Sequence, residues 1–219
     1  MKIRITALCL SCIFSSLALL HAQEVQGPTP AQAWQRLKDG NERFVAGKPD
    51  KKDLDAKKRA ALTKGQSPFA IVLTCADSRV PPELLFNQGL GDLFVLRVAG
   101  NISGPFVMGS IDYGVEHLHA PLIVVLGHES CGAVSTALGK DKPGGNLGKL
   151  IDEIHVGKNL PEDKTKAMAA AIRNNAHYHA EQVLMKSEIV RKHVAEKKLR
   201  VVSGYYSLST GKVEWLTQK

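Results

Sequence analysis

The sequence predicts a single α/β domain built on a mainly parallel central β-sheet flanked by helices. Two apolar runs, 69–74 and 121–126, have the length of strands that are buried on both faces of a sheet. Segments with helical spacing alternate with such runs, which is typical of parallel sheets with helical connections. The 219 residues, of which 44% are hydrophobic, suffice for one globular domain with a core of useful size.

The first 22 residues have the layout of a secretory signal peptide. A short basic start is followed by an apolar stretch, 5–20, and by the small residue Ala22. This stretch is short for a membrane-spanning helix, which needs about 20 apolar residues. We therefore expect a signal peptide at 1–22 and a single domain at 23–219. The mature chain would be periplasmic or secreted, with no stable membrane span.

The N-terminal part of the domain is expected to be helical. Thr29 can cap a helix that has Pro30 at its first position, and an apolar stripe follows one face of that helix as far as Val45. A second, strongly basic helix is expected over 53–64, because Gly65 can end it.

Strands and helices then alternate to the C-terminus. Short apolar runs predict the strands, and apolar residues on one side predict the helices between them. In chain order we expect a strand at 69–74, a helix starting at 82–86, a strand at 92–98, a loop at 101–105, a helix at 106–119, a strand at 121–126, a helix at 131–138, a loop at 139–148, a helix at 147–155, a broken helical stretch at 162–197, and closing strands at 200–206 and 213–216.

The charge pattern does not favour a nucleic-acid partner. The formal net charge is +8, and much of the excess lies in short basic runs. Aromatic residues make up 5% of the chain, and none interleaves with these runs as a base-stacking surface would require. We therefore interpret the runs as solvated helix faces.

Residues able to carry chemistry follow two of the predicted strands directly. Cys75, Asp77 and Arg79 come after the first buried strand, and His128 and Cys131 come after the apolar run at 121–126. In open parallel sheets, ligands bind at the carboxyl ends of the strands. Both groups are therefore expected to meet at one edge of the sheet.

These residue types suit a zinc ion. Two thiolates and one imidazole leave a fourth tetrahedral position free. Cys131 would lie at a helix start, where the helix dipole favours the thiolate. A carboxylate at Asp77 that is fixed by Arg79 can accept a hydrogen bond at the open position. We expect one zinc ion per chain.

The same two cysteines permit another interpretation. In an oxidising compartment, Cys75 and Cys131 could form a disulfide, and the chain would then be a non-enzymatic exported module. That hypothesis leaves His128, Asp77 and Arg79 without a role. The other histidines fall in predicted helices or polar stretches and are interpreted as surface or core residues: His117, His119, His155, His177, His179 and His193.

At these motifs the sequence resembles the beta-class carbonic anhydrases. Cys-x-Asp-x-Arg followed at a distance by His-x-x-Cys is similar to the signature of that family, and the likeness extends from about Trp34 to the C-terminus through segments such as 65–68, 91–94 and 97–101. The resemblance implies a carbonate dehydratase that converts carbon dioxide to bicarbonate and a proton, reversibly, and the signal-peptide pattern at 1–22 implies that this enzyme is exported. Some relatives with similar motifs instead hydrolyse carbon disulfide or carbonyl sulfide.

The resemblance also implies roles for individual residues. Zinc would be held by Cys75, His128 and Cys131, with water or Asp77 as the fourth ligand, and Asp77 would pair with Arg79 in the active form.

The substrate pocket implied by the resemblance lies between subunits. Gln66 would position the substrate, and Phe94 and Tyr113 would form an apolar wall contributed by a partner subunit. A homodimer or higher homo-oligomer is therefore expected, with an N-terminal helical arm across the partner.

Overall fold

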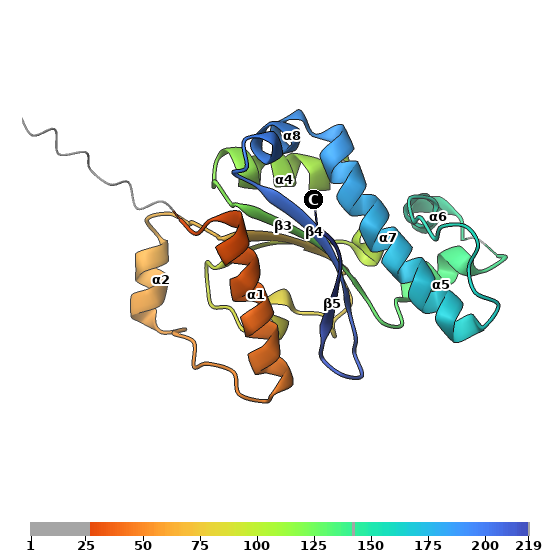
Figure 1. The fold of residues 1–219 in the computed structure, drawn as a ribbon, viewed down its shortest axis with the longest axis horizontal. Helices are drawn as coiled ribbons and strands as arrows, with labels where there is room; N and C mark the ends of the chain where they lie inside the picture. Colours follow the sequence, from red (N-terminus) through yellow and green to blue (C-terminus); the bar gives the residue numbers. More distant parts are fainter. Residues whose placement is uncertain (1–26, 142, 219) are drawn as a thin grey trace, which may run out of the picture.

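The computed structural model describes residues 27–141 and 143–218, and the expected signal peptide at 1–22 lies outside them. A five-stranded sheet forms the centre of the domain, with strand order β2-β1-β3-β4-β5 (Figure 1). The first four strands in this order are parallel, and β5 runs antiparallel to β4. The strands are β1 Ala70–Thr74, β2 Leu93–Arg97, β3 Leu122–His128, β4 Arg200–Tyr206 and β5 Val213–Gln218.

The burial of the strands explains their sequence pattern. Every residue of β1 and β3 is buried, because both strands lie inside the sheet and are covered on both faces. Such strands carry continuous apolar runs rather than an alternating pattern. The edge strand β2 is only partly buried. The predicted fold class and its mainly parallel sheet are confirmed.

Helices cover both faces of this sheet. One face packs on α1 and α3 through a core that includes Trp34, Leu37 and Leu85, whereas the other packs on α4, α7 and α8 through a core that includes Ile111, Val183 and Val190. These helices are α1 Pro30–Val45, α3 Pro82–Leu85, α4 Pro105–Glu116, α7 Lys164–Lys186 and α8 Glu188–Ala195.

The N-terminal arm has a packed part and an exposed part. The hydroxyl of Thr29 accepts a hydrogen bond from the backbone N–H of Gln32 at 3.3 Å, which caps α1 as expected. The helix α2, Ala56–Leu62, has no buried residue and projects from the body of the domain (Figure 1).

A third group of short helices lies at the carboxyl ends of the strands. It comprises a 3-10 turn at Ala99–Asn101, α5 Gly132–Leu138 and α6 Gly145–Asp152. The turn lies between the predicted strand at 92–98 and the predicted loop at 101–105, and it overlaps that loop only at Asn101. The helix α6 starts and ends earlier than predicted, so His155 lies in the loop after it rather than in a helix. In the part of the chain that the structure describes, no helix is both long and apolar enough to cross a bilayer.

Candidate metal centre

Parallel pairing of β1 with β3 brings together the segments 75–79 and 128–131, which hold the candidate metal ligands. Thr74, the last residue of β1, pairs with Leu126 of β3, and its hydroxyl donates a hydrogen bond to the Leu126 carbonyl at 3.0 Å. Cys75 follows β1 directly, and His128 is the last residue of β3. The ligand atoms of Cys75, His128 and Cys131 all lie within 4.8 Å of one another. The expected meeting of both segments at one edge of the sheet is therefore observed.

A tight turn places His128 and Cys131 side by side. Ser130 between them adopts a left-handed conformation, with φ of 56°, which folds the chain back. Cys131 is the N-cap residue of α5. Nδ1 of His128 donates a hydrogen bond to the carbonyl of Glu129 at 2.9 Å, so Nε2 is the nitrogen that carries the free lone pair in the neutral ring.

The three side chains fit a zinc ion. His128 is fully buried, and its Nε2 has no hydrogen-bond partner in the described structure. A buried polar atom without a partner is costly, and a metal ion at that position would satisfy it. Two sulfurs and one imidazole nitrogen form a donor set that zinc favours, and the Nδ1–H bond to a backbone carbonyl is the outer contact that commonly orients a histidine ligand.

The two sulfurs interact directly in the structure. Cys75 and Cys131 are both free, buried cysteines. A hydrogen bond from Cys131 is the main cause that lowers the pKa of Cys75 to about 4, and the same contact raises the pKa of Cys131. One thiolate therefore opposes the formation of the second. A divalent cation between them would favour ionisation of both.

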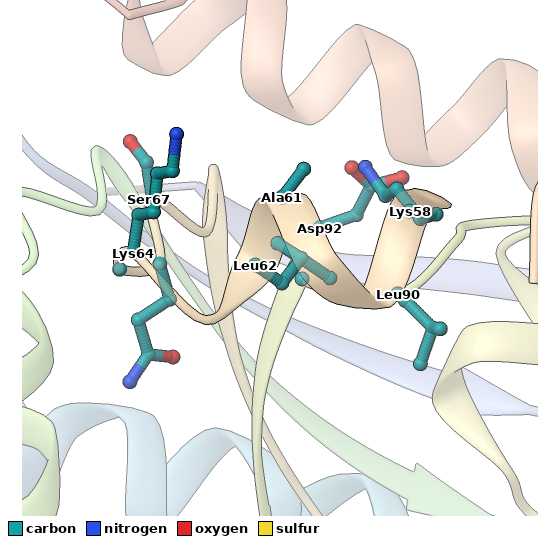
Figure 2. Close-up of a pocket in the computed structure, with 10 residues that line it drawn as sticks. Lys58, Ala61, Leu62, Lys64, Ser67, Leu90 and Asp92 are labelled. Carbon is teal, nitrogen blue, oxygen red and sulfur yellow. The ribbon is translucent and has the colours of Figure 1, made fainter. Parts of the chain in front are cut away.

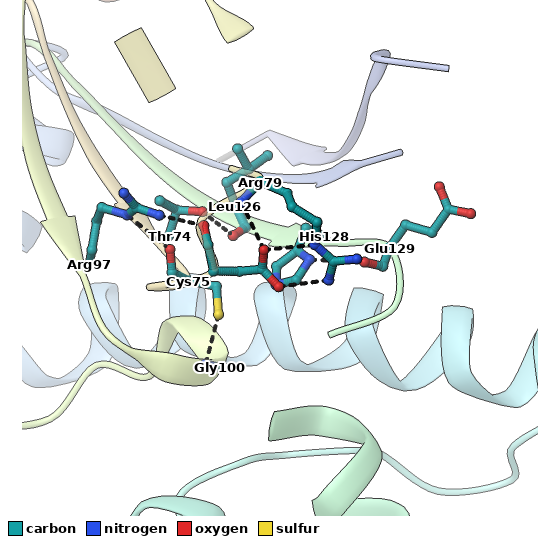
Figure 3. Close-up of polar contacts among 9 residues, drawn as sticks. Thr74, Cys75, Arg79, Arg97, Gly100, Leu126, His128 and Glu129 are labelled. Carbon is teal, nitrogen blue, oxygen red and sulfur yellow. Dashed lines mark hydrogen bonds and ion pairs between the residues drawn. The ribbon is translucent and has the colours of Figure 1, made fainter. Parts of the chain in front are cut away.

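Asp77 lies beside this group and is held by Arg79. Its Oδ1 accepts hydrogen bonds from the backbone N–H and Nε of Arg79, both at 2.9 Å, and its Oδ2 accepts one from Nη2 at 2.7 Å (Figure 3). The bonds from Arg79 hold the pKa of Asp77 well below its usual range. Oδ2 is also 3.9 Å from Nε2 of His128. The carboxylate is thus ionised, fixed and next to the candidate metal ligands Cys75, His128 and Cys131, called the metal-ligand group below.

Sequence reasoning missed two residues that support Cys75. Arg97, at the end of β2, donates hydrogen bonds to the carbonyls of Cys75 and Asp77 and so fixes the loop between them (Figure 3). The backbone N–H of Gly100 donates to the Cys75 sulfur at 3.4 Å. Both residues lie in the segment 97–101. That segment is part of the family likeness, but no role was predicted for either residue from the sequence.

Three predicted pocket residues lie apart from the ligands in this single chain. Gln66 is exposed and lines a pocket beside α2. Leu62 and Asp92 line the same pocket (Figure 2). The rings of Phe94 and Tyr113 have centroids 6.3 Å apart, and Tyr113 is 47% exposed. Among the described residues, no hydrogen bond or ring contact joins Gln66, Phe94 or Tyr113 to the metal-ligand group.

Comparisons with known proteins agree on one family. A family model described as "Carbonic anhydrase" matches residues 70–213. "Carbonic anhydrase 2" of Mycobacterium tuberculosis is 39% identical over 188 residues, which cover 84% of this chain and 91% of that protein.

Two solved structures extend the agreement to the fold. A Coccomyxa beta-carbonic anhydrase in complex with acetazolamide is 29% identical with a TM-score of 0.68, over 75% of this chain and 79% of that one. A tetrameric beta-carbonic anhydrase from Sordaria macrospora is 26% identical with a TM-score of 0.66, over 74% and 87% of the two chains.

Proposed function

Because this chain belongs to the beta-class carbonic anhydrases, we propose that it catalyses the zinc-dependent, reversible hydration of carbon dioxide to bicarbonate and a proton. The observation that carries the proposal is the convergence of Cys75, His128 and Cys131 beside an ionised, anchored Asp77. One zinc ion per chain would be held by the three converging side chains. When bound, zinc supplies Lewis-acid activation that brings the pKa of a water molecule towards neutrality.

Asp77 is proposed to orient the reacting water rather than to take its proton. Its carboxylate has a pKa well below the usual range because Arg79 stabilises the charged form, so it is a poor base but a permanent hydrogen-bond acceptor. Oδ2 faces the ligand group and can fix the direction of one O–H bond, which aligns the nucleophile. The proton released by the reaction then passes to solvent.

Arg79 and Arg97 hold Asp77 from two sides. Arg79 binds the carboxylate, and Arg97 binds the main-chain carbonyl of Asp77. The loop that carries the acceptor is therefore fixed at both its side chain and its backbone. The Asp77 carboxylate is therefore preorganised: it is already in position before each turnover and does not have to move into place.

The substrate pocket is proposed to be completed by a second copy of the chain. Phe94 lies on the edge strand β2 and Tyr113 on α4, and the exposed Tyr113 ring provides apolar surface that a single chain leaves uncovered. A partner subunit would bring this wall to the carbon dioxide site, where Gln66 would position the substrate, as the resemblance implies. A homodimer or higher homo-oligomer is the proposed active form, and the Sordaria relative is described as tetrameric.

We also propose that the protein is exported from the cytoplasm and acts in the periplasm or outside the cell. The proposal rests on the signal-peptide pattern at 1–22, which lies outside the described residues. Sequencing the N-terminus of the protein recovered from its native host tests it. A mature chain that begins at Gln23 supports export, and an intact N-terminus contradicts it.

Zinc content and carbon dioxide hydration on the purified protein test the proposed activity together. We expect one zinc per chain and a rate that rises from mildly acidic to mildly alkaline pH, because ionisation of water is favoured as pH rises. If the protein contains zinc and hydrolyses carbon disulfide or carbonyl sulfide but does not hydrate carbon dioxide, one of these sulfur compounds is the substrate instead. Absence of zinc together with no free thiols in the denatured, chelated protein would establish the disulfide module instead.

A further inference from the structure

Two buried polar side chains of α7 hold the chain segment that follows β2. Nδ2 of Asn175 donates a hydrogen bond to the carbonyl of Gly100 at 2.8 Å. One helical turn later, Nδ1 of His179 accepts a hydrogen bond from the backbone N–H of Ser103 at 3.1 Å. Asn175 and His179 are 0% and 2% exposed. Since residues four apart share one helix face, α7 binds this segment at two neighbouring points.

The orientation of the Asn175 amide is determined by its partners. Its Oδ1 accepts a hydrogen bond from the backbone N–H of His155 at 2.9 Å, while its Nδ2 donates to the carbonyl of Gly100. A backbone N–H can only donate and a carbonyl can only accept, so the reversed amide would lose both bonds. Asn175 therefore ties Gly100 to the loop after α6 in one arrangement.

Gly100 is the residue through which this arrangement reaches Cys75. Its N–H donates to the Cys75 sulfur at 3.4 Å. Its φ of 70° is in the left-handed region, and a Cβ added there would approach Cδ1 of Ile154 to 2.9 Å. The position of Gly100 is thus sterically confined on one side and hydrogen-bonded on the other.

We propose that Asn175 is a positioning residue for the metal centre. It holds Gly100 so that the Gly100 N–H keeps its hydrogen bond to the Cys75 thiolate, a bond that stabilises negative charge on sulfur and so tunes the sulfur as a ligand. This inference rests on the proposed zinc site. It adds an outer contact that reaches Cys75 from α7, in addition to the support that Arg97 gives from β2.

Isosteric substitution tests the proposal. Asn175→Asp keeps the side-chain size and an oxygen for the His155 N–H, but it removes the Nδ2 donor to Gly100. The matched control is Asn174→Asp, the same change one residue earlier, where the half-buried Asn174 donates from Nδ2 to the carbonyl of Val156 at 3.0 Å. Cobalt(II) serves as the probe, because its thiolate charge-transfer absorption reports directly on the metal–sulfur bond.

We expect Asn175→Asp to weaken cobalt and zinc binding about 10- to 100-fold, the range typical of losing an outer contact to a metal ligand, and to shift the charge-transfer band. The control should change affinity less than about threefold and leave the band unshifted, since it does not touch Gly100. Equal affinities and equal spectra in wild type and Asn175→Asp would overturn the proposal. A band shift of the same size in the control would also overturn it.

A measurement on the unmodified chain keeps the proposal testable if the variant does not fold. In protein loaded with cadmium-113, a hydrogen bond from an amide to a metal-bound sulfur produces scalar coupling between the amide proton and cadmium. We expect this coupling at Gly100, and its absence would overturn the inference. A wild-type chain that binds no metal would instead refute the proposed function, so the two failures are distinguishable.

Discussion

The buried histidine of α7 makes the stability of the fold dependent on pH. His179 is 2% exposed, and burial lowers its pKa from 6.5 to about 4. The charges of Lys186 and His155 act in the same direction. Nδ1 accepts the N–H of Ser103, so protonation at Nδ1 would also break that bond. The folded chain therefore keeps His179 neutral over a pH range in which the unfolded chain protonates it.

The expected size follows from linkage between protonation and folding. Because the folded pKa is lower than the unfolded one, the stabilisation is fully present above pH 6.5 and is lost as pH falls towards 4. At ~1.4 kcal/mol per pKa unit the whole effect is about 3 kcal/mol, and about 2 kcal/mol of it is lost between pH 7 and pH 5. This is a large part of the stability of an ordinary domain.

Urea unfolding of the metal-free protein at pH 7 and pH 5, at one fixed protein concentration, measures this loss. In His179→Asn, the side-chain oxygen can replace Nδ1 as the acceptor for Ser103, but the side chain does not titrate. We expect wild type to lose about 2 kcal/mol more than His179→Asn between the two pH values.

Ser103→Ala is the control, because it removes only the contact between the Ser103 hydroxyl and His179 Nδ1, 2.9 Å apart. It should lower stability at both pH values and leave the pH-dependent difference as in wild type. An equal loss in wild type and His179→Asn would refute the reasoning.

Three further predictions concern the metal centre and the assembly. Asp77→Ala should retain one zinc per chain but lose roughly 100-fold in hydration rate, because the acceptor that aligns the nucleophile is gone; full activity would remove Asp77 from the mechanism. Cys131→Ser should lose zinc on dialysis, since a hydroxyl replaces a thiolate ligand; stoichiometric zinc in atomic absorption would contradict the ligand assignment. Sedimentation at assay concentration should show a dimer or larger species, whereas an active monomer would contradict the shared pocket.

Much of the fold was predictable from local signals. The apolar runs at 69–74 and 121–126 became β1 and β3, because interior strands of a parallel sheet need apolar residues on both faces. The broken helical stretch at 162–197 became α7 and α8, with the break at Ser187, whose hydroxyl caps α8. The boundaries around α6 were less accurate, since that segment begins with glycines and its N-cap, Gly144, offers no side chain to mark the start of the helix.

The core of the candidate site was predictable for a topological reason. Cys75 and His128 stand at the ends of two strands, and parallel neighbours in one sheet present their carboxyl ends at the same edge. Cys131 is only three residues beyond His128, so a single turn suffices to bring it in. The pairing of Asp77 with Arg79 is equally local, because the two residues are two apart in one loop.

The supporting contacts from α7 were not predictable in this way. Asn175 and His179 reach Gly100 and Ser103 across sequence separations of 75 and 76 residues, and an asparagine or a histidine within a helix has no pattern that distinguishes a buried hydrogen-bonding role from a solvated one. From the sequence, His179 was interpreted as a surface or core residue, and no role was predicted for Asn175. Yet both are buried, and the Asn175 amide and the Nδ1 atom of His179 have backbone partners, as buried polar groups usually do. The face of α7 that carries them is therefore constrained by the segment beside the ligands as well as by the core of the sheet. A change in the packing of this helix should alter metal affinity even where no ligand is touched.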